Sequence, residues 1–238
     1  KAVSELSIRV QEQMVYGILG PNGSGKTTTL GMLLGVINSN QGTYSWFENG
    51  TKDENRKRIG SLLETPNFYP YLSAKQNLEI TAKIKGIDDA SAEIDKVLKL
   101  VDLYERRNSK FKTFSLGMKQ RLAIGGALIG SPEVLVLDEP TNGLDPQGIA
   151  EIRDLIIEIG RKGKTIIIAS HILDEIEKVC THCAILKNGK LLRTGTIKEI
   201  IGNQEHTLIQ IGAKDTKKIE KIILEDSELS IYKKSEEN

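Results

Sequence analysis

The stretch "MVYGILGPNGSGKTTTLGMLLGVI", residues 14–37, decides the fold because its pattern changes twice within a short length. Residues 14–20 are almost entirely apolar and predict a buried strand, whereas residues 26–37 have the pattern of a helix. Between them, "GPNGSGKT" (20–27) matches GxxxxGK[ST], a pattern that cradles phosphate groups where it joins a strand to a helix. This context predicts an α/β domain built around a phosphate-binding loop, with an ordinary glycine turn before a helix as the alternative.

Each part of this loop has a reason in the chemistry of phosphate binding. Glycines at 20, 23 and 25 allow successive backbone N–H groups to turn toward one anion, and the N-terminus of the following helix adds its dipole. Lys26 can reach the β- and γ-phosphates, and the Thr27 hydroxyl can ligate Mg²⁺. We therefore expect ATP and Mg²⁺ as cofactors. The residues expected to bind the nucleotide here are Gly20, Pro21, Asn22, Gly23, Ser24, Gly25, Lys26, Thr27 and Thr28.

A second stretch, "VLVLDEP" (134–140), supplies acidic groups for the same site. Its four apolar residues predict a buried strand that delivers Asp138 at its carboxyl end, beside the phosphate loop. We expect Asp138 to hold Mg²⁺, and Glu139 to face the γ-phosphate and polarise the attacking water as a general base. The alternative for such an acidic pair is a solvated loop.

Alternation of short apolar runs with helical patterns predicts a mainly parallel sheet for the rest of the chain. Asn188 and Gly189 predict the turn of an antiparallel hairpin over 182–195. Asp145 followed by Pro146 predicts the start of a helix. Further strands are expected at 42–47, 58–64, 133–138 and 164–170, and helices at 146–159 and 172–180.

The middle of the chain has helical periodicity from residue 73 to residue 129. Ser73 and Gln76 have the spacing of a capping box, which predicts where the first of these helices begins. The domains expected are residues 1–204 as one nucleotide-binding domain, an inserted helical subdomain at about 66–130, and residues 205–238 as a short charged extension without a motif.

Composition narrows the classes of protein that fit. The 238 residues are 39% hydrophobic and 27% charged, which is ordinary for a soluble globular protein. A net charge of +1 without a polybasic run, and an aromatic content of 5%, do not favour a nucleic-acid partner. No apolar run approaches the roughly 20 residues that span a bilayer, and no signal-peptide pattern opens the sequence, so we expect any membrane role from the cytosolic surface.

The two cysteines occur in "CTHC", as Cys180 and Cys183. A CxxC pair with a His inside could indicate redox chemistry or half of a zinc site. The sequence contains no second CxxC, and Cys180 falls on the apolar helix face of Ile176 and Val179. We therefore expect packed, reduced thiols.

Three further stretches complete a family pattern: "FSLGM" (114–118), "DEPTNGLDP" (138–146) and "SH" (170–171). Together with the phosphate loop, their order and spacing resemble those of ATP-binding cassette (ABC) transporter ATPases over nearly the whole chain up to about residue 200. The resemblance implies a P-loop NTPase fold of the RecA-like type. In this fold a mainly parallel sheet carries an antiparallel β subdomain and an inserted α-helical subdomain.

The resemblance also implies roles for single residues. "FSLGM" stands where the family has its LSGGQ signature, which Ser115 and Gly117 match while the other three positions depart from it. Cassettes of this family pair head to tail, so the signature of one copy closes over the γ-phosphate held by the other. Asp145 resembles the aspartate of the family's D-loop and is expected to contribute to the nucleotide site. His171 resembles the switch histidine that contacts the γ-phosphate, although a lone His is more often a satisfied core or surface residue.

Two longer stretches narrow the resemblance: "IGSLLETPNFYPYLSAKQNL" (59–78) and "SLGMKQRL" (115–122). They are similar to the bacitracin-resistance and lantibiotic-immunity branch of export-type cassettes. Glu64 stands where most cassettes have the Gln of the Q-loop. A carboxylate there would add negative charge near Mg²⁺, so we include Glu64 among the expected metal ligands.

Aromatic residues bear on the expected partners. By resemblance, the group Phe68, Tyr69 and Tyr71 would lie where a membrane subunit docks, and the alternative is ordinary core and turn packing. The family also stacks an aromatic residue on adenine. We expect that residue upstream of Lys1, because Tyr16 falls in the predicted buried strand.

Together these features favour the ATP-binding and ATP-hydrolysing subunit of an ABC exporter that powers a separate transmembrane permease subunit. The expected partners are that permease and a second ATPase subunit, without nucleic acid, and the expected location is cytoplasmic, on the inner face of the cell membrane. The alternatives are DNA-maintenance cassettes, which carry long coiled-coil insertions, and ribosome-associated cassettes, which usually carry two cassettes in one chain. Antimicrobial peptide is the first expectation for the substrate, with lipid, polysaccharide or cell-surface machinery as alternatives.

Overall fold

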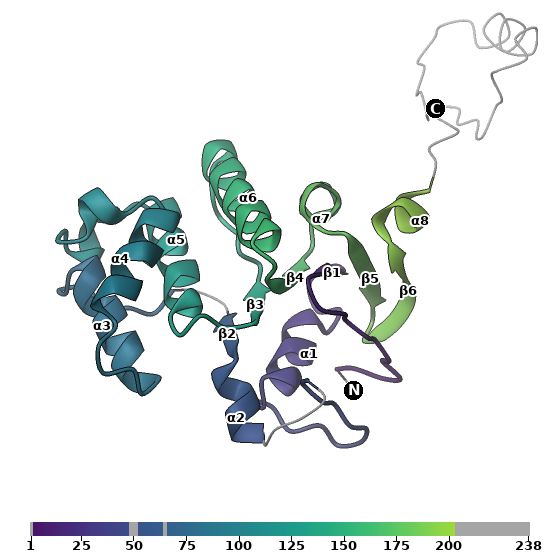
Figure 1. Cartoon of the computed structure of the whole chain (residues 1–238). Helices are drawn as coiled ribbons and strands as arrows, with labels where there is room; N and C mark the ends of the chain where they lie inside the picture. The colour runs from purple at the N-terminus through teal and green to yellow at the C-terminus, as the bar shows by residue number, and fades with distance from the viewer. Residues whose placement is uncertain (1, 48–51, 64–65, 203–238) are drawn as a thin grey trace, which may run out of the picture. The chain divides into compact units, whose positions relative to one another are not determined.

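The computed structural model describes residues 2–47, 52–63 and 66–202. Glu64 and the expected C-terminal extension therefore lie outside the described residues. Within the described ranges, six strands form one sheet in the order β2-β3-β4-β1-β5-β6 (Figure 1). The strands are β1 (Val15–Leu19), β2 (Ile59–Leu62), β3 (Val134–Asp138), β4 (Thr165–Ser170), β5 (His182–Lys187) and β6 (Lys190–Thr196).

The register of the sheet brings distant motifs to one edge. Neighbouring strands are parallel except for β5 and β6, which pair antiparallel. Leu19 at the end of β1 pairs with Ser170 at the end of β4, and Asp138 of β3 pairs with Ala169. Because the carboxyl ends of parallel strands meet at one edge, the phosphate loop, the acidic pair and His171 emerge from the sheet together.

Helices cover both faces of this sheet. Ile166 and Ile168 of β4 pack in one hydrophobic cluster with Ile152 of helix α6, whereas Ile167 packs in a second cluster with Leu30 of helix α1. None of the helices in the described ranges is long and apolar enough to cross a membrane. The helices are α1 (Lys26–Leu33), α2 (Lys52–Lys57), α3 (Ala74–Ile84), α4 (Ser91–Leu100), α5 (Leu116–Leu128), α6 (Pro146–Arg161), α7 (Leu173–Val179) and α8 (Ile197–Ile201).

The predicted helix boundaries are confirmed where a side chain caps the helix. Ser73 and Gln76 form both hydrogen bonds of the predicted capping box at the start of α3. By contrast, α1 ends at Leu33 and not at the predicted Ile37. Gly35 adopts a φ of 71°, a left-handed conformation that ends a helix at little steric cost.

The strand predicted at 42–47 is wrong, because that segment has no regular structure. Gly42 and Phe47 adopt positive φ angles of 86° and 60°, which interrupt an extended conformation. The Trp46 indole donates a hydrogen bond to the Leu33 carbonyl at 2.7 Å. Trp46 and Phe47 therefore pack in the same cluster as residues of α1 without pairing in the sheet.

Helices α3, α4 and α5 pack on one another beyond β2, where Figure 1 shows them as a group. Helix α5 approaches β2 closely, since a Cβ atom on Gly60 would collide with the Ala127 carbonyl oxygen. The boundaries of an inserted helical subdomain at 66–130 remain a prediction.

The expectation of packed thiols is confirmed. Cys180 and Cys183 are both buried and both free. Burial raises the pKa of the Cys180 thiol well above its usual range, because the thiolate would lose its hydration. These thiols belong to the core and have the character of small apolar side chains.

Candidate active site

The phosphate loop closes around the Lys26 side chain, which is only 5% exposed. Its ammonium group donates hydrogen bonds to the carbonyl oxygens of Gly20 at 2.7 Å and Pro21 at 3.3 Å. Gly23 and Gly25 adopt left-handed φ angles of 78° and 99°, which a residue with a Cβ atom would adopt only under strain. Gly25 is the N-cap of α1 and no side chain caps that helix, so its first N–H groups can serve an anion.

Gly20 differs from the role expected for it. Its N–H donates to the Ser170 carbonyl at 3.2 Å, so this group is used in the fold and not turned toward a ligand. A Cβ atom at this position would lie 2.5 Å from the Ser24 Oγ and still closer to the Leu186 carbonyl oxygen. Glycine is needed here for a close approach between the loop and β5.

The hairpin turn at Asn188 and Gly189 is confirmed, and it lies against the phosphate loop. The two residues have φ angles of 51° and 74°, as a two-residue turn between antiparallel strands requires. The Gly189 N–H donates to the Ser24 carbonyl at 3.1 Å, and the Ser4 N–H donates to the Gly189 carbonyl at 2.7 Å. The sequence predicts the turn but not this contact, which depends on the pairing of β1 with β5.

The acidic pair lies at the carboxyl end of β3, as predicted. Asp138 ends the strand and is 2% exposed. Glu139 follows with a positive φ of 46°, and its N–H donates to the Ala169 carbonyl of β4 at 2.9 Å. A left-handed conformation at a residue other than glycine is costly and occurs preferentially at functional sites.

Three ionisable side chains form a continuous chain across this edge of the sheet. The Lys26 Nζ lies 3.3 Å from the Glu139 Oε1, and the His171 Nδ1 lies 2.8 Å from the Glu139 Oε2. Lys26 is buried, Glu139 is one-fifth exposed and His171 is 37% exposed, so the chain runs from the interior to the surface. The three residues come from three separate motifs of the sequence, and the fold brings them together.

The donors at this edge fit a Mg²⁺ ion whose ligands come partly from the protein and partly from phosphate oxygens. Thr27 is exposed in the first turn of α1, which packs against β3, the strand that carries Asp138. Among the described residues, no group of three or more His, Cys, Asp or Glu side chains could hold a metal alone. Mg²⁺ typically takes one or two protein ligands together with substrate phosphates, so this sparse set suits it.

The predicted signature residues are not joined to the phosphate loop by any hydrogen bond found among the described residues. Ser115 is the N-cap of α5, and its Oγ accepts a hydrogen bond from the Met118 N–H at 3.2 Å. Open space surrounds the position of a Cβ atom on Gly117. Asp145 similarly caps α6, with its Oδ1 accepting from the Gly148 N–H at 2.8 Å. Ser115 and Asp145 are exposed, and Gly117 is partly exposed.

The aromatic group after β2 divides into a partly buried residue and two exposed residues. Phe68 is partly buried and packs against the core, edge-to-face on Phe111 with ring centroids 5.3 Å apart. Tyr69 and Tyr71 are 49% and 63% exposed. Packing therefore explains Phe68, whereas the two tyrosines are available to a partner.

A model of the ABC transporter family matches residues 3–142. The chain belongs to this family. Bacitracin transport ATP-binding protein BcrA of Bacillus licheniformis is 50% identical over 196 residues, which are 81% of this chain and 64% of that protein. The BcrA protein of Enterococcus faecalis is 39% identical over 202 residues, 83% of this chain and 65% of that protein. The chain thus spans less than two thirds of the length of these two relatives.

Solved ABC structures share the fold. The cbiO1 protein of Clostridium perfringens, part of the ABC transporter complex cbiONQ, is 29% identical with a TM-score of 0.75, and the match covers 84% of each chain. The ATP-binding cassette MJ0796, dimeric and bound to ADP and Pi, is 26% identical with a TM-score of 0.70, over 82% of this chain and 90% of that one. The described domain is an ABC ATPase domain and binds nucleotide, and the predicted fold class is confirmed.

Proposed function

We propose that this chain is the ATP-hydrolysing subunit of an ABC exporter and drives a separate transmembrane permease. The contact of Glu139 with both Lys26 and His171 carries this proposal, because it places a proton acceptor beside the lysine that would hold the β- and γ-phosphates. Glu139 takes a proton from the water that attacks the γ-phosphorus, and ADP leaves. His171 steadies Glu139 through Nδ1 and hydrogen-bonds the γ-phosphate.

Mg²⁺ would be held by Thr27 and Asp138, together with phosphate oxygens of ATP. When bound, the ion neutralises charge that develops on the phosphate oxygens during transfer. Glu64, at the Q-loop position, is proposed as a further contact of the ion or of its waters.

A second copy of the chain would complete each nucleotide site. The phosphate loop of one copy would face Ser115, Gly117 and Asp145 of the other, which gives two composite sites in a head-to-tail dimer. The exposure of Ser115 and Asp145 at the starts of α5 and α6 supports this arrangement. The dimeric MJ0796 structure with ADP and Pi supports it as well.

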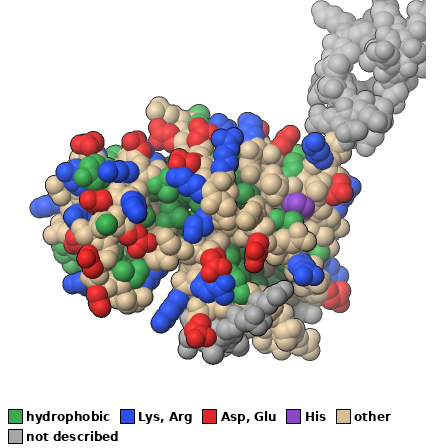
Figure 2. Space-filling model, in the orientation of Figure 1, with side chains coloured by type: hydrophobic (Ala, Val, Ile, Leu, Met, Phe, Trp, Pro, Cys, Tyr) green, Lys and Arg blue, Asp and Glu red, His purple; other side chains and the backbone are tan. Residues whose placement is uncertain are grey.

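Transport is proposed from the relatives. The two BcrA proteins are named as bacitracin transport ATP-binding proteins, so an antimicrobial peptide is the substrate class we propose. The exposed Tyr69 and Tyr71 are the proposed contact for a permease at the inner face of the membrane. Figure 2 shows basic and acidic side chains interspersed over the visible face of the described residues, unlike the basic stripe typical of nucleic-acid binding.

The general base is tested with Glu139→Gln. The amide cannot accept the proton of water, so we expect kcat to fall about 10²- to 10⁴-fold while ATP binding persists. Lys26→Ala is the matched comparison, because it weakens nucleotide binding itself. Binding of a fluorescent ATP analogue and release of phosphate separate the two effects. Near wild-type hydrolysis by Glu139→Gln would show that another group is the base.

A further inference from the structure

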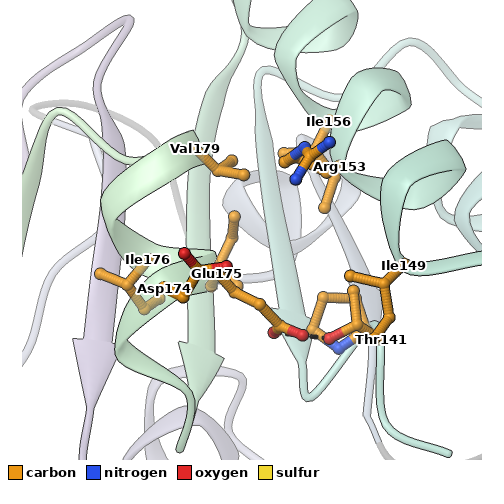
Figure 3. Close-up of a pocket in the computed structure, with 10 residues that line it drawn as sticks. Thr141, Ile149, Arg153, Ile156, Asp174, Glu175, Ile176 and Val179 are labelled. Carbon is orange, nitrogen blue, oxygen red and sulfur yellow. Dashed lines mark hydrogen bonds between the residues drawn. The ribbon is translucent and has the colours of Figure 1, made fainter. Parts of the chain in front are cut away.

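A carboxylate that has no role in the proposed hydrolysis joins the segment that carries Glu139 to the segment that carries His171. Glu175 lies in the first turn of α7 and is partly buried. Its Oε2 accepts a hydrogen bond from the Thr141 hydroxyl at 2.6 Å and a second from the Ser170 hydroxyl at 3.1 Å. Figure 3 shows the Glu175 carboxylate reaching Thr141 from the neighbouring helix. Thr141 lies two residues after Glu139, and Ser170 lies immediately before the switch histidine.

Burial makes this bridge hard to replace with water. Thr141 is 6% exposed and Ser170 is fully buried, so Glu175 is the acceptor that satisfies both hydroxyl groups. A separation of 2.6 Å is typical of a charge-assisted O–H···O⁻ hydrogen bond. The Ser170 Oγ also accepts from the Ile172 N–H at 3.1 Å, which fixes the start of α7.

The bridge through Glu175 is one of several links between the segment of Glu139 and Thr141 and the segment of Ser170 and His171. Glu139 donates its N–H to the Ala169 carbonyl, and its carboxylate accepts a hydrogen bond from the His171 ring at Nδ1. On the other side of the segment, the Leu144 N–H donates to the Thr141 carbonyl at 3.2 Å, so the link extends into the turn before α6. A shift of Thr141 or Ser170 would therefore move Glu139 relative to His171.

We propose that Glu175 is a positioning residue that sets the distance between Glu139 and His171. This inference rests on the catalytic roles proposed for those two residues. Glu175 acts through its hydrogen bonds with the Thr141 and Ser170 hydroxyls.

The surroundings of Glu175 allow a conservative variant that tests the bridge. A cavity of about 30 Å³, large enough for a water molecule, lies beside it and is lined by Thr141, Arg153 and Glu175. The Glu175 Oε1 is buried and has no hydrogen-bond partner among the described residues. In Glu175→Gln the amide oxygen can take the place of Oε2, while the NH₂ group occupies the position of Oε1.

The experiment compares steady-state ATP hydrolysis by the purified chain and its variants. For Glu175→Ala we expect kcat to fall about 10- to 100-fold, since small displacements of catalytic groups cost that much, while KM changes less than about twofold. Glu175→Gln should recover most of kcat. Thr141→Val, which removes one donor, should lower kcat, and the double variant with Glu175→Ala should be no worse than Glu175→Ala alone. Glu177→Ala, an exposed carboxylate on the same helix, is the control and should match the wild type.

Two results would overturn the proposal. One is a wild-type kcat in Glu175→Ala. The other is a fall in kcat of Glu175→Ala that comes with a raised KM and adds fully to the fall in Thr141→Val, while Glu175→Ala and Glu175→Gln lower the melting temperature equally. That pattern belongs to general destabilisation. Glu139→Gln, measured in parallel, separates this inference from the proposed function. An active Glu139→Gln refutes the general base, whereas an inactive Glu139→Gln with a normal Glu175→Ala refutes only the role of Glu175.

Discussion

Helices α1 and α5 both begin with small residues that suit an anion, yet their surroundings differ. Helix α1 starts after Gly25, has no side-chain cap and carries the buried Lys26. Helix α5 starts after Ser115, whose own side chain caps it, and has open space at Gly117. The loop before α1 is held by a hydrogen bond from the β5–β6 turn, whereas the turn before α5 is exposed.

We infer from this difference that the α1 end can bind phosphate by itself, whereas the α5 end is proposed to complete a site on another copy. The α1 end has uncapped N–H groups and a lysine, which together neutralise and orient a phosphate. The α5 end has a hydroxyl and a close-approach glycine but no charge in its first turn before Lys119. A second anion-binding turn in one chain is explained if it serves the nucleotide of another copy.

The strongest test of this comparison mixes two inactive proteins. Lys26→Ala removes the α1 site, and Ser115→Arg blocks the α5 site, so neither homodimer should hydrolyse ATP. In a mixed dimer, one intact phosphate loop meets one intact signature, and activity should return to at most about a quarter of the wild type if pairing is random and sites act independently. Phosphate release after mixing is the measurement.

The control for that mixture is nucleotide-dependent dimerisation, which is measured by size-exclusion chromatography in the presence of ATP. If Ser115 acted within its own chain, mixing would restore nothing even though mixed dimers form. Strong cooperation between the two sites would also suppress recovery of activity. A covalently linked dimer in which only one of the two sites is intact therefore provides the reference activity.

A contrast between local sequence patterns and tertiary contacts also decides how much of the fold could be predicted from the sequence. Strands β1, β3 and β4 are continuous apolar runs, and the caps at Ser73 and Asp145 follow local rules, so both were predicted correctly. The structure of segment 42–47 was not, because Trp46 and Phe47 serve tertiary packing that no local pattern shows.

The candidate site divides in the same way. Lys26, Asp138 and Glu139 carry motif signals, and the carboxyl ends of parallel strands dictate that they meet. Glu175 has no motif signal, since in the sequence it is only an acidic residue in the first turn after His171. Its partners come from two other segments of the chain, and such contacts depend on the order of strands in the sheet and on how α7 packs.

A second prediction concerns the support of the α1 end by the hairpin turn. Gly189→Ala places a Cβ atom at a φ of 74° and against the Ala2 carbonyl, so the turn must shift away from Ser24. Gly163→Ala is the matched control, with a φ of 83° and open space around the added atom. Both should lose about 1 kcal/mol of unfolding free energy from backbone strain. Gly189→Ala should lose more, and it alone should weaken binding of an ATP analogue. Equal binding by the two variants would show that the turn does not support the loop.

The smallest expected effect separates the two uses of Ser115 at the α5 end. Ser115→Ala removes the hydrogen bond to the Met118 N–H and should cost about 1 kcal/mol, or about 2–4 °C in melting temperature. Ser115→Asp keeps an N-cap oxygen and should melt within about 1 °C of the wild type, since Asp caps as well as Ser. The two variants should then rank oppositely in catalysis, because a carboxylate facing the γ-phosphate of the other copy repels it, whereas a methyl group only loses a hydrogen bond. Melting curves and ATPase rates on the same preparations provide the comparison. If Ser115→Asp were as active as Ser115→Ala, the α5 end would be a capped helix start and not half of a nucleotide site.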